Sequence, residues 1–467
     1  MRYVSTRGQA PALDFEGVTL AGLAPDGGLY LPIEWPHFDA ERIREMRGWP
    51  YADLACEVML PFIGDSLTGD ELFELCQHAY SAFSHAAVTP LVQLDEQHWL
   101  LELFHGPTLA FKDIALQLLG RLFETFLDRR GQHLTIVGAT SGDTGSAALH
   151  GVMGRPNIDI VMLHPAGRIS EVQRRQMTTL HAPNIYNIAI EGSFDDAQAM
   201  VKRMFTDRQV TSTVTLGAVN SINWARLMAQ VVYYFYAALQ LGAPDRAVAF
   251  SVPTGNFGDV FAGYIAHAMG LPVERLVVAT NCNDILHRAL SEGDYSRREL
   301  TPTEAPSMDI QVSSNFERLL YCEGGRDGEA LAALMRVFEE NNRLSLTDEQ
   351  RAGMNILLSS HAVTSDAMQY AMTWAYREAG EVIDPHTAIG LSAARALVLA
   401  DDLDPATPIV TLATAHPAKF PDSVERAIGV RPELPARLGN LFERDEHYQT
   451  LPADYAAVRD YVLGTAR

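Results

Sequence analysis

Short apolar segments alternate with helical patterns from about residue 96 to residue 282, and this alternation constrains the fold more than any other feature. The expected strands cover residues 99–104, 134–137, 158–163, 185–190, 248–252 and 276–279, and another is expected at 408–413. Such an alternation requires right-handed crossovers between parallel strands, with helices on both faces of the sheet. The sequence therefore predicts an α/β fold whose ligands bind in the loops after the carboxyl ends of the strands.

The regions around this alternating segment have a different character. Residues 1–95 contain a turn-rich segment at 22–32 and two helical patterns, and we expect them to form an N-terminal accessory domain. The core is expected at 96–430, with a mainly helical portion around 283–400. Residues 431–467 are expected to form a peripheral C-terminal extension.

Charge and cysteine content exclude several classes of function. The chain carries 36 basic and 58 acidic residues, a net charge of −22, which argues against nucleic acids and anionic membranes as partners but not against a small anion. The four cysteines are scattered without a Cys-x-x-Cys pair, so we expect reduced thiols and no metal site. The sequence has no apolar signal region and no apolar run long enough to span a bilayer. A cytoplasmic protein is therefore expected.

Lys112 stands at the junction between an expected strand and an expected helix. Gly106 and Pro107 break the strand, and an apolar helix is expected to run to about Arg129. Apolar neighbours and the positive end of the helix dipole both disfavour the ammonium form. Lys112 is therefore a candidate nucleophile for a Schiff base with a carbonyl cofactor. The alternative, a solvated lysine beside Asp113, remains open on this segment alone.

A first loop of small residues follows the strand expected at 134–137. Its backbone N–H groups, at the start of the next helix, could bind an anion such as a carboxylate. The loop is neither Gly-x-Gly-x-x-Gly nor a Walker A sequence. A tight turn with an N-cap at Ser141 or Asp143 is the alternative, and it is compatible with binding. The candidate residues are Ser141, Gly142, Asp143, Thr144 and Gly145.

Two further loops follow strands later in the chain. After residues 248–252, Gly255, Asn256, Phe257 and Gly258 could form a nest of backbone N–H donors around a phosphate. This loop lacks a lysine, so the main chain and the helix dipole would have to bind the anion. After residues 408–413, Thr414 can offer a hydroxyl to a ring nitrogen, and His416 and Lys419 add titratable groups. His416, taken singly, is expected to be a hydrogen-bonded structural residue.

Together these segments resemble the threonine synthase family. The resemblance is carried by residues 104–113, 140–145, 254–259 and 413–420, and by 22–32, 219–226 and 313–318 for the longer bacterial and fungal branch. It runs in the family's order from the N-terminus to about residue 430. The resemblance implies a pyridoxal-phosphate enzyme of the tryptophan-synthase-β-like fold (fold type II). Its parallel-sheet core would have two subdomains and an N-terminal accessory domain.

The resemblance also implies roles for individual residues. Lys112 would form the Schiff base with pyridoxal 5′-phosphate, residues 255–258 would bind the cofactor phosphate, and Thr414 would contact the pyridine nitrogen. The loop from Ser141 to Gly145 would face the substrate carboxylate. Many fold type II relatives carry Ser-Gly-Asn where this chain has Ser-Gly-Asp. An ionised carboxylate cannot donate a hydrogen bond to the cofactor phenolate, so the resemblance does not define the role of Asp143.

The implied reaction converts O-phospho-L-homoserine and water into L-threonine and phosphate. A dianionic substrate phosphate needs cations or donors, and arginine matches its geometry best. The candidates for this contact are Asn220, Ser221, Asn223 and Arg226, for which a helix cap and a helix-face arginine are an equally weighted alternative. Two rival functions remain open: a serine or threonine dehydratase or β-replacement enzyme of the same fold, and an inactive ligand-binding protein. The oligomeric state, monomer or homodimer, also remains open.

Overall fold

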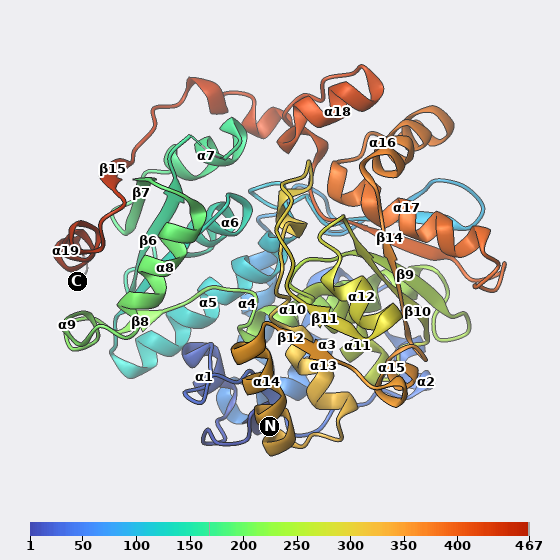
Figure 1. Ribbon diagram of the computed structural model, residues 1–467, viewed down its shortest axis with the longest axis horizontal. Helices are drawn as coiled ribbons and strands as arrows, with labels where there is room; N and C mark the ends of the chain where they lie inside the picture. The colour runs from blue at the N-terminus through green and yellow to red at the C-terminus, as the bar shows by residue number, and fades with distance from the viewer. Residues whose placement is uncertain (168, 466–467) are drawn as a thin grey trace.

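The alternation of strands and helices produces two separate parallel sheets (Figure 1), in a computed structural model that describes residues 1–167 and 169–465. The larger sheet has the strand order β13-β10-β9-β14-β4-β3 and the smaller one β15-β7-β6-β5-β8. The strands of the larger sheet are β13 (Leu358–Ala362), β10 (Val273–Thr280), β9 (Val248–Pro253), β14 (Ile409–Ala413), β4 (His98–Glu102) and β3 (Leu91–Gln93). Those of the smaller sheet are β15 (Gln449–Pro452), β7 (Ile185–Glu191), β6 (Ile158–Pro165), β5 (Leu134–Ala139) and β8 (Leu216–Gly217).

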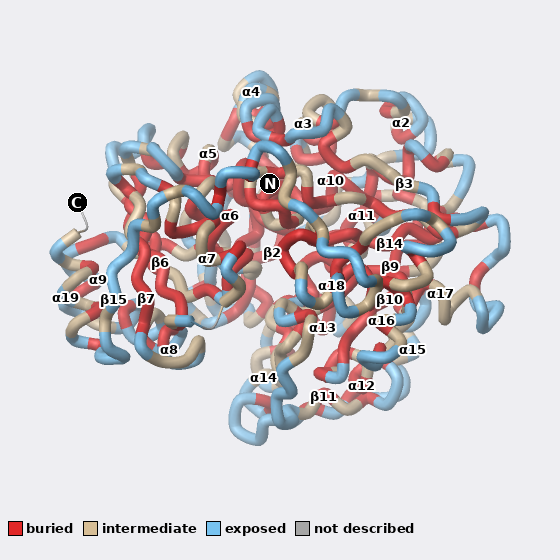
Figure 2. The backbone as a smooth tube through the Cα atoms, turned by 90° about the horizontal axis from the view of Figure 1, so that it is seen from above, coloured by how far each residue is buried: buried red, intermediate tan, exposed pale blue. Residues whose placement is uncertain are grey.

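Helices cover both faces of the five-stranded sheet, which explains the near-continuous apolar sequence of its central strands. Every residue of β6 is buried, and Figure 2 shows this sheet buried between its helices. One face packs on the central core of the molecule, and the other forms a separate apolar cluster with the C-terminal helix. The helices are α5 (Lys112–Arg130), α6 (Asp143–Val152), α7 (Glu171–Thr178), α8 (Phe194–Met204), α9 (Arg208–Thr211) and α19 (Tyr455–Thr465).

The six-stranded sheet is covered in the same way. Its inner face packs on the central core through α10 (Trp224–Gln240) and α11 (Gly258–Ala268). Its outer face forms a second apolar cluster with α16 (Ser365–Trp374) and α17 (Pro385–Leu399). Only β3 runs antiparallel, paired with β4. The predicted parallel α/β core is therefore correct, and it is divided between two sheets.

The N-terminal region packs beneath both sheets (Figure 1) and contributes to the central core. Its aromatic side chains contact α10 and α5: the rings of Tyr3 and Trp224 lie 5.6 Å apart, and those of Phe15 and Phe126 lie 6.1 Å apart. Its elements are β1 (Tyr3–Ser5), α1 (Phe15–Ala21), β2 (Tyr30–Pro32), α2 (Ala40–Glu45), α3 (Tyr51–Ile63) and α4 (Gly69–Tyr80). The following strand β3 already belongs to the six-stranded sheet, so the N-terminal region joins the core without a break.

Residues 283–400 are mainly helical, as expected, but they also supply three strands that the sequence did not reveal. Strand β13 forms one edge of the six-stranded sheet, and β11 (Asp294–Ser296) pairs with β12 (Arg343–Ser345). In β13 a single leucine is followed by small and polar residues, so it lacks the apolar alternation of a strand. The other helices of this portion are α12 (Ile285–Glu292), α13 (Phe316–Glu323), α14 (Gly328–Asn341) and α15 (Asp348–Met354).

The C-terminal segment crosses the top of the molecule in Figure 1, from α18 (Pro421–Ile428) to β15. There β15 pairs with β7 in parallel and becomes the edge of the five-stranded sheet. The sequence prediction missed this strand because Gln449-Thr450-Leu451-Pro452 has little strand character. An edge position tolerates the proline. The extension thus lies at the periphery and adds a strand to the sheet of the other subdomain.

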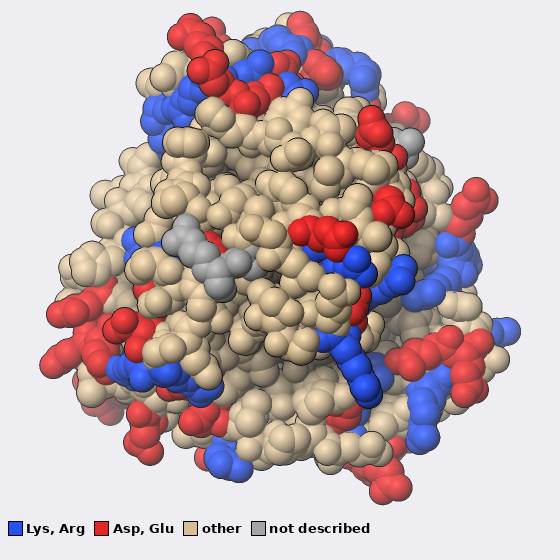
Figure 3. Space-filling view, turned by 90° about the vertical axis from the view of Figure 1, so that its left-hand side faces the viewer, with Lys and Arg blue, Asp and Glu red and all other residues tan. Residues whose placement is uncertain are grey.

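The surface carries interspersed charges of both signs. On the face shown in Figure 3, acidic and basic side chains lie mainly around the rim, and uncharged residues fill most of the centre. Among the described residues, no helix combines the length and the apolarity that crossing a bilayer requires. Loops of the two sheets contact each other: Lys112 after β4 and Lys419 after β14 both lie beside Asp143 after β5.

Candidate active site

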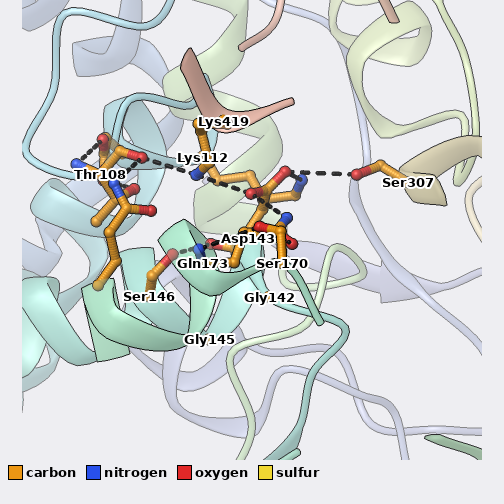
Figure 4. Close-up of polar contacts among 12 residues, drawn as sticks. Thr108, Lys112, Gly142, Asp143, Gly145, Ser146, Ser170, Gln173, Ser307 and Lys419 are labelled. Atoms are coloured by element: carbon orange, nitrogen blue, oxygen red, sulfur yellow. Dashed lines mark hydrogen bonds and ion pairs between the residues drawn. The ribbon is translucent and has the colours of Figure 1, made fainter. Parts of the chain in front are cut away.

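Lys112 is the first residue of α5, at the end of the loop that follows β4 (Figure 4). Its side chain is only 13% exposed, and Nζ lies 5.0 Å from the centre of the Phe111 ring. Burial lowers the pKa of the Lys112 amine, and the nearby charges of Lys419 and Arg226 lower it further. Lys112 therefore occupies the helix start and the desolvated setting that its sequence context predicts.

The carboxylate that faces Lys112 comes from the other sheet. Oδ2 of Asp143, at the start of α6, lies 3.5 Å from Nζ of Lys112. The sequence neighbour Asp113 turns away and accepts hydrogen bonds from the backbone and the hydroxyl of Thr108, at 2.7 and 2.8 Å. Gly106 permits this turn, because a Cβ there would lie 2.4 Å from Cβ of Asp113. The alternative of a solvated lysine beside Asp113 is therefore wrong.

A second lysine binds the same carboxylate. Nζ of Lys419 lies 2.8 Å from Oδ1 of Asp143 and donates to the carbonyl of Thr108 at 2.7 Å. The side chain of Lys419 is fully buried. Gln173 also donates to Oδ1, at 2.9 Å. The two ammonium groups hold the pKa of Asp143 far below its usual range, despite its burial.

The first loop differs from the sequence expectation in the position of its helix. Helix α6 begins at Asp143, inside the segment predicted to be the loop, and its N-cap is Gly142, with φ of 136°. Neither Ser141 nor Asp143 caps the helix. The hydroxyl of Thr140 does so instead, since it accepts from the N–H groups of Gly142 and Gly145 at 3.0 and 2.9 Å. The side chain of Asp143 is thereby free to face the two lysines.

The second loop keeps its donors free. Phe257 has φ of 61° and precedes α11, which begins at Gly258. Within the described part of the chain, the backbone N–H groups of residues 255–258 donate to no protein acceptor. A left-handed residue directly before a helix gathers such N–H groups into an anion-binding nest. The geometry therefore fits the phosphate of a cofactor, as the sequence predicts.

Residues 313–315, which lead into α13, hold this loop in place. Ser313 donates its hydroxyl to the carbonyl of Gly255 at 2.7 Å, and the backbone and side chain of Asn315 donate to the carbonyl of Asn256 at 3.1 and 3.0 Å. The side-chain amide of Asn315 also donates to the carbonyl of Ser221 at 3.3 Å. Asn315 thus connects the glycine loop after β9 to the polar cluster after β8. The sequence analysis assigned it no role in the site.

Some polar residues after β8 have structural partners, and others have groups that remain available to bind a ligand. Asn223 is the N-cap of α10: its side chain accepts from Ala225 N–H at 3.0 Å and donates to the carbonyl of Thr19 at 2.9 Å. Asn220 is exposed. Arg226 is only 3% exposed, donates to the carbonyl of Val219 at 2.8 Å, and has a buried Nε without a partner. Burial lowers the pKa of Arg226 to about 10. A buried guanidinium with an unsatisfied donor fits an anionic ligand.

Thr414 and His416 lie in the loop after β14, beside the lysine loop. The carbonyl of Thr414 accepts from Phe111 N–H at 2.9 Å, and His416 N–H donates to the carbonyl of Leu109 at 3.0 Å. Nδ1 of His416 accepts from Ala418 N–H at 3.1 Å, and burial lowers its pKa to about 4. His416 is therefore a neutral structural residue, as predicted, and Thr414 lies one residue from the end of β14.

Together these groups fit pyridoxal phosphate. Lys112 could hold the aldehyde, the free backbone donors of residues 255–258 could hold the phosphate, and the hydroxyl of Thr414 could face the ring nitrogen. Among the described residues, no group of three His, Cys, Asp or Glu side chains could hold a metal ion.

The role of Lys419 was missed, although the composition contains a signal for it. The chain has only three lysines, Lys112, Lys202 and Lys419. Arginine supplies all other basic side chains, and it cannot be deprotonated in a protein. Because this sequence otherwise uses arginine, a buried lysine marks a position where the side chain can lose its proton. Two of the three lysines lie at this site.

Comparisons with known proteins cover nearly the whole chain. Residues 2–80 match the family model described as the threonine synthase N terminus, residues 82–349 match that of pyridoxal-phosphate dependent enzymes, and residues 387–462 match the threonine synthase C-terminal model. A threonine synthase from Pseudomonas aeruginosa is 55% identical over 463 residues, which are 99% of this chain and 98% of the relative.

Solved structures agree with these matches. The crystal structure of a PLP-bound threonine synthase from Brucella melitensis has a TM-score of 0.97 and 50% identity, and each chain covers 100% of the other. The yeast threonine synthase structure has a TM-score of 0.95 and 38% identity, with 99% of this chain and 98% of that one covered. The expected fold type II architecture is confirmed. The chain belongs to the threonine synthase family of pyridoxal-phosphate-dependent enzymes.

Proposed function

We propose that this chain is a threonine synthase that converts O-phospho-L-homoserine and water into L-threonine and phosphate. One observation carries the proposal beyond family membership. The desolvated amine of Lys112 lies near two sets of groups suited to different anions: the charge of the buried guanidinium of Arg226 acts on it, and the amine acts in turn on Asp259, which directly follows the free N–H donors after β9. A substrate that carries its own phosphate, in addition to a cofactor phosphate, matches this arrangement.

The residues that would hold the cofactor come mostly from the six-stranded sheet. Nζ of Lys112 would bind the aldehyde, the N–H groups of residues 255–258 would bind the phosphate, and the hydroxyl of Thr414 would face the pyridine nitrogen. When bound, pyridoxal phosphate supplies an electron sink for carbanion chemistry at the substrate amino acid. A threonine hydroxyl does not transfer a charge to the ring nitrogen, so the surrounding residues must supply much of the electrostatic stabilisation.

The residues proposed for the substrate come from the five-stranded sheet and the segment after it. Arg226 would bind the leaving phosphate through its unpaired Nε, and the nearby Asn220 and Ser221 remain candidates for additional donors. The loop Ser141 to Gly145 would face the substrate carboxylate, with the N–H groups that Thr140 leaves free. As a neutral amine, Lys112 would move protons at Cα and Cβ of the substrate. Its lowered pKa favours this role because a general base must be unprotonated near neutral pH.

The decisive experiment incubates the purified chain and pyridoxal phosphate with O-phospho-L-homoserine, and measures phosphate and threonine in the same sample. We expect the two products in equal amounts. Formation of a keto acid from serine or threonine, without turnover of phosphohomoserine, would favour a dehydratase of the same fold. The absence of cofactor absorption after reconstitution would favour an inactive binding protein.

We also propose that the protein works in the cytoplasm. All four cysteines are free, which suits a reducing compartment. The site residues described above all come from one chain, so a monomer and a homodimer are both compatible with the proposed activity. Size-exclusion chromatography with light scattering separates the two.

A further inference from the structure

The site contains one carboxylate between two buried ammonium groups (Figure 4). Asp143 lies 2.8 Å from Nζ of Lys419 and 3.5 Å from Nζ of Lys112. Its two oxygens are divided between them: Oδ1 binds Lys419 and Gln173, and Oδ2 faces Lys112 and accepts from Ser307 at 3.4 Å. Lys419 is the closer and the more deeply buried of the two partners. The shared carboxylate is thus divided unequally between the two amines, and Lys112 has the longer contact with it.

Other charged groups near the pair have hydrogen-bond partners of their own. The charged groups that face Lys112 are Asp143, Lys419, Arg226 and Asp259. Burial raises the pKa of Asp259 to about 6, so this carboxyl is ionised above that pH, and its oxygen accepts hydrogen bonds from the hydroxyls of Tyr233 and Tyr234. The guanidinium of Arg226 adds a third buried cation.

The groups near Lys419 give the same result. Asp113 also acts on Lys419; burial raises its pKa to about 6, so it is ionised above that pH, and its oxygens accept hydrogen bonds from the N–H and the hydroxyl of Thr108. Burial lowers the pKa of the nearby His150 to about 4, so its ring is neutral. Of these acids, Asp143 is the one in direct contact with Lys419, at 2.8 Å, so its Oδ1 is less available to Lys112.

We propose that Lys419 is a positioning residue: its ammonium binds one oxygen of Asp143 so that the other oxygen faces Lys112, and its charge makes Lys112 the lysine that gives up its proton. Lys419 thereby prepares the reactive amine without taking part in the reaction. The use of Lys112 as that amine rests on the proposed function, whereas its protonation state does not.

The proposal predicts opposite effects for the two partners of the ion pair. In Lys419→Met, Asp143 turns to Lys112 alone, so the pH at which Lys112 is half protonated should rise by about one to two units. In Asp143→Asn, two buried ammonium groups lose their shared anion, so this midpoint should fall by a similar amount. A role in packing alone would change stability without shifting the two midpoints in opposite directions.

The midpoint can be measured on the full chain after removal of the cofactor. Brief pulses of acetic anhydride at a series of pH values label neutral amines, and peptide mass spectrometry quantifies each lysine. The exposed Lys202 is an internal reference in every sample. Ser307→Ala is the matched control, because it removes a hydrogen bond to Asp143 without removing a charge. It should leave the Lys112 midpoint within about 0.3 pH units of the original value.

If Lys419→Met does not fold, Asp143→Asn and the double variant Asp143→Asn/Lys419→Met decide the question. The double variant replaces the ion pair with neutral side chains, and it should raise the Lys112 midpoint above that of Asp143→Asn. An unchanged midpoint on removal of Lys419, in either background, or shifts in the same direction for both single variants, would overturn the proposal.

The cofactor-loaded chain tests the proposed function separately. Pyridoxal phosphate should protect Lys112 from acetylation and leave Lys202 reactive. If pyridoxal phosphate did not protect Lys112, but the midpoints in the cofactor-free chain shifted in opposite directions, the assigned cofactor contact would be rejected. The role of Lys419 would be retained.

Discussion

The two loops that begin α6 and α11 look alike in sequence but perform different tasks. Each joins a buried strand to a helix through glycines, and each places an aspartate at the helix start, Asp143 and Asp259. In the first loop Thr140 occupies two of the N–H groups, and the aspartate side chain faces two lysines. In the second loop the N–H groups stay free, and the aspartate turns to tyrosine hydroxyls.

The difference shows that a small-residue turn before a helix does not by itself define an anion site. What matters is whether a nearby side chain already accepts from the N–H groups. The first loop supplies a negative charge to the site, and the second supplies donors for one. We propose that the two loops complement each other around Lys112.

The largest expected effect comes from Lys112, the residue that both loops serve. Lys112→Ala removes the amine that would bind the cofactor and move protons. We expect activity to fall by at least about a thousandfold. Covalent attachment of the cofactor, trapped with borohydride and detected by mass spectrometry, should also disappear. Substantial turnover by this variant would mean that the two loops serve another residue.

Arg226 tests whether the substrate phosphate lies on the side of the first loop. Arg226→Ala should raise KM for phosphohomoserine by about thirtyfold or more, because it removes a buried cation from a dianion. The absorption spectrum of the bound cofactor should stay the same, since the second loop is intact. Arg336→Ala, an exposed arginine of α14, is the control. Unchanged kinetics would remove Arg226 from the substrate site.

Two glycine variants separate the loops directly. A Cβ at Gly255 would lie 2.7 Å from the carbonyl of Ser307. Gly255→Ala should therefore displace the donor loop and weaken cofactor binding about tenfold or more. A Cβ at Gly142 would lie 2.6 Å from Cδ of Gln173, at a φ of 136°. Gly142→Ala should disturb Asp143 and lower kcat about tenfold, with cofactor affinity within about threefold of the original.

Cofactor titration by fluorescence and steady-state kinetics measure both properties of the glycine variants. If both variants weakened cofactor binding equally, the two loops would not have the separate tasks assigned to them.

The smallest effects concern the pH dependence of stability at the two aspartates. Asp259 has its pKa raised to about 6, so the folded state keeps a proton that the unfolded state loses between pH 4 and 6. Stability should fall over this window as pH rises, by up to about 3 kcal/mol. Asp259→Asn should remove that loss. As pH rises from 4 to 6, the urea unfolding midpoint of the variant should therefore increase relative to that of the original chain.

Asp143 should show the opposite slope. Its pKa is lowered in the folded state, so its contribution to stability is present at neutral pH and is lost in acid. Asp143→Asn should therefore be most destabilised at neutral pH, and the deficit should shrink below about pH 4. If the urea unfolding midpoints of both variants changed with pH in the same way, the different environments of the two aspartates would be contradicted.

The local part of this site could be predicted from the sequence. The strands that precede the loops, the position of Lys112 at a helix start and the donor loop after β9 each depend on a few neighbouring residues. Apolar alternation and glycine placement are local signals, so one sequence is enough to read them. The strands β13 and β15 lack those signals and were missed.

The tertiary structure alone decided which charges meet. The sequence offers Asp113 as the neighbour of Lys112, yet the fold turns Asp113 to Thr108 and brings Asp143 and Lys419 from distant segments. Coulomb energies and desolvation depend on distance in space and on burial, and neither follows from sequence separation. The sequence by itself thus determined which lysine begins the helix and which loop has free backbone N–H groups. Only the packing of the two sheets determined which charges surround that lysine and therefore its pKa.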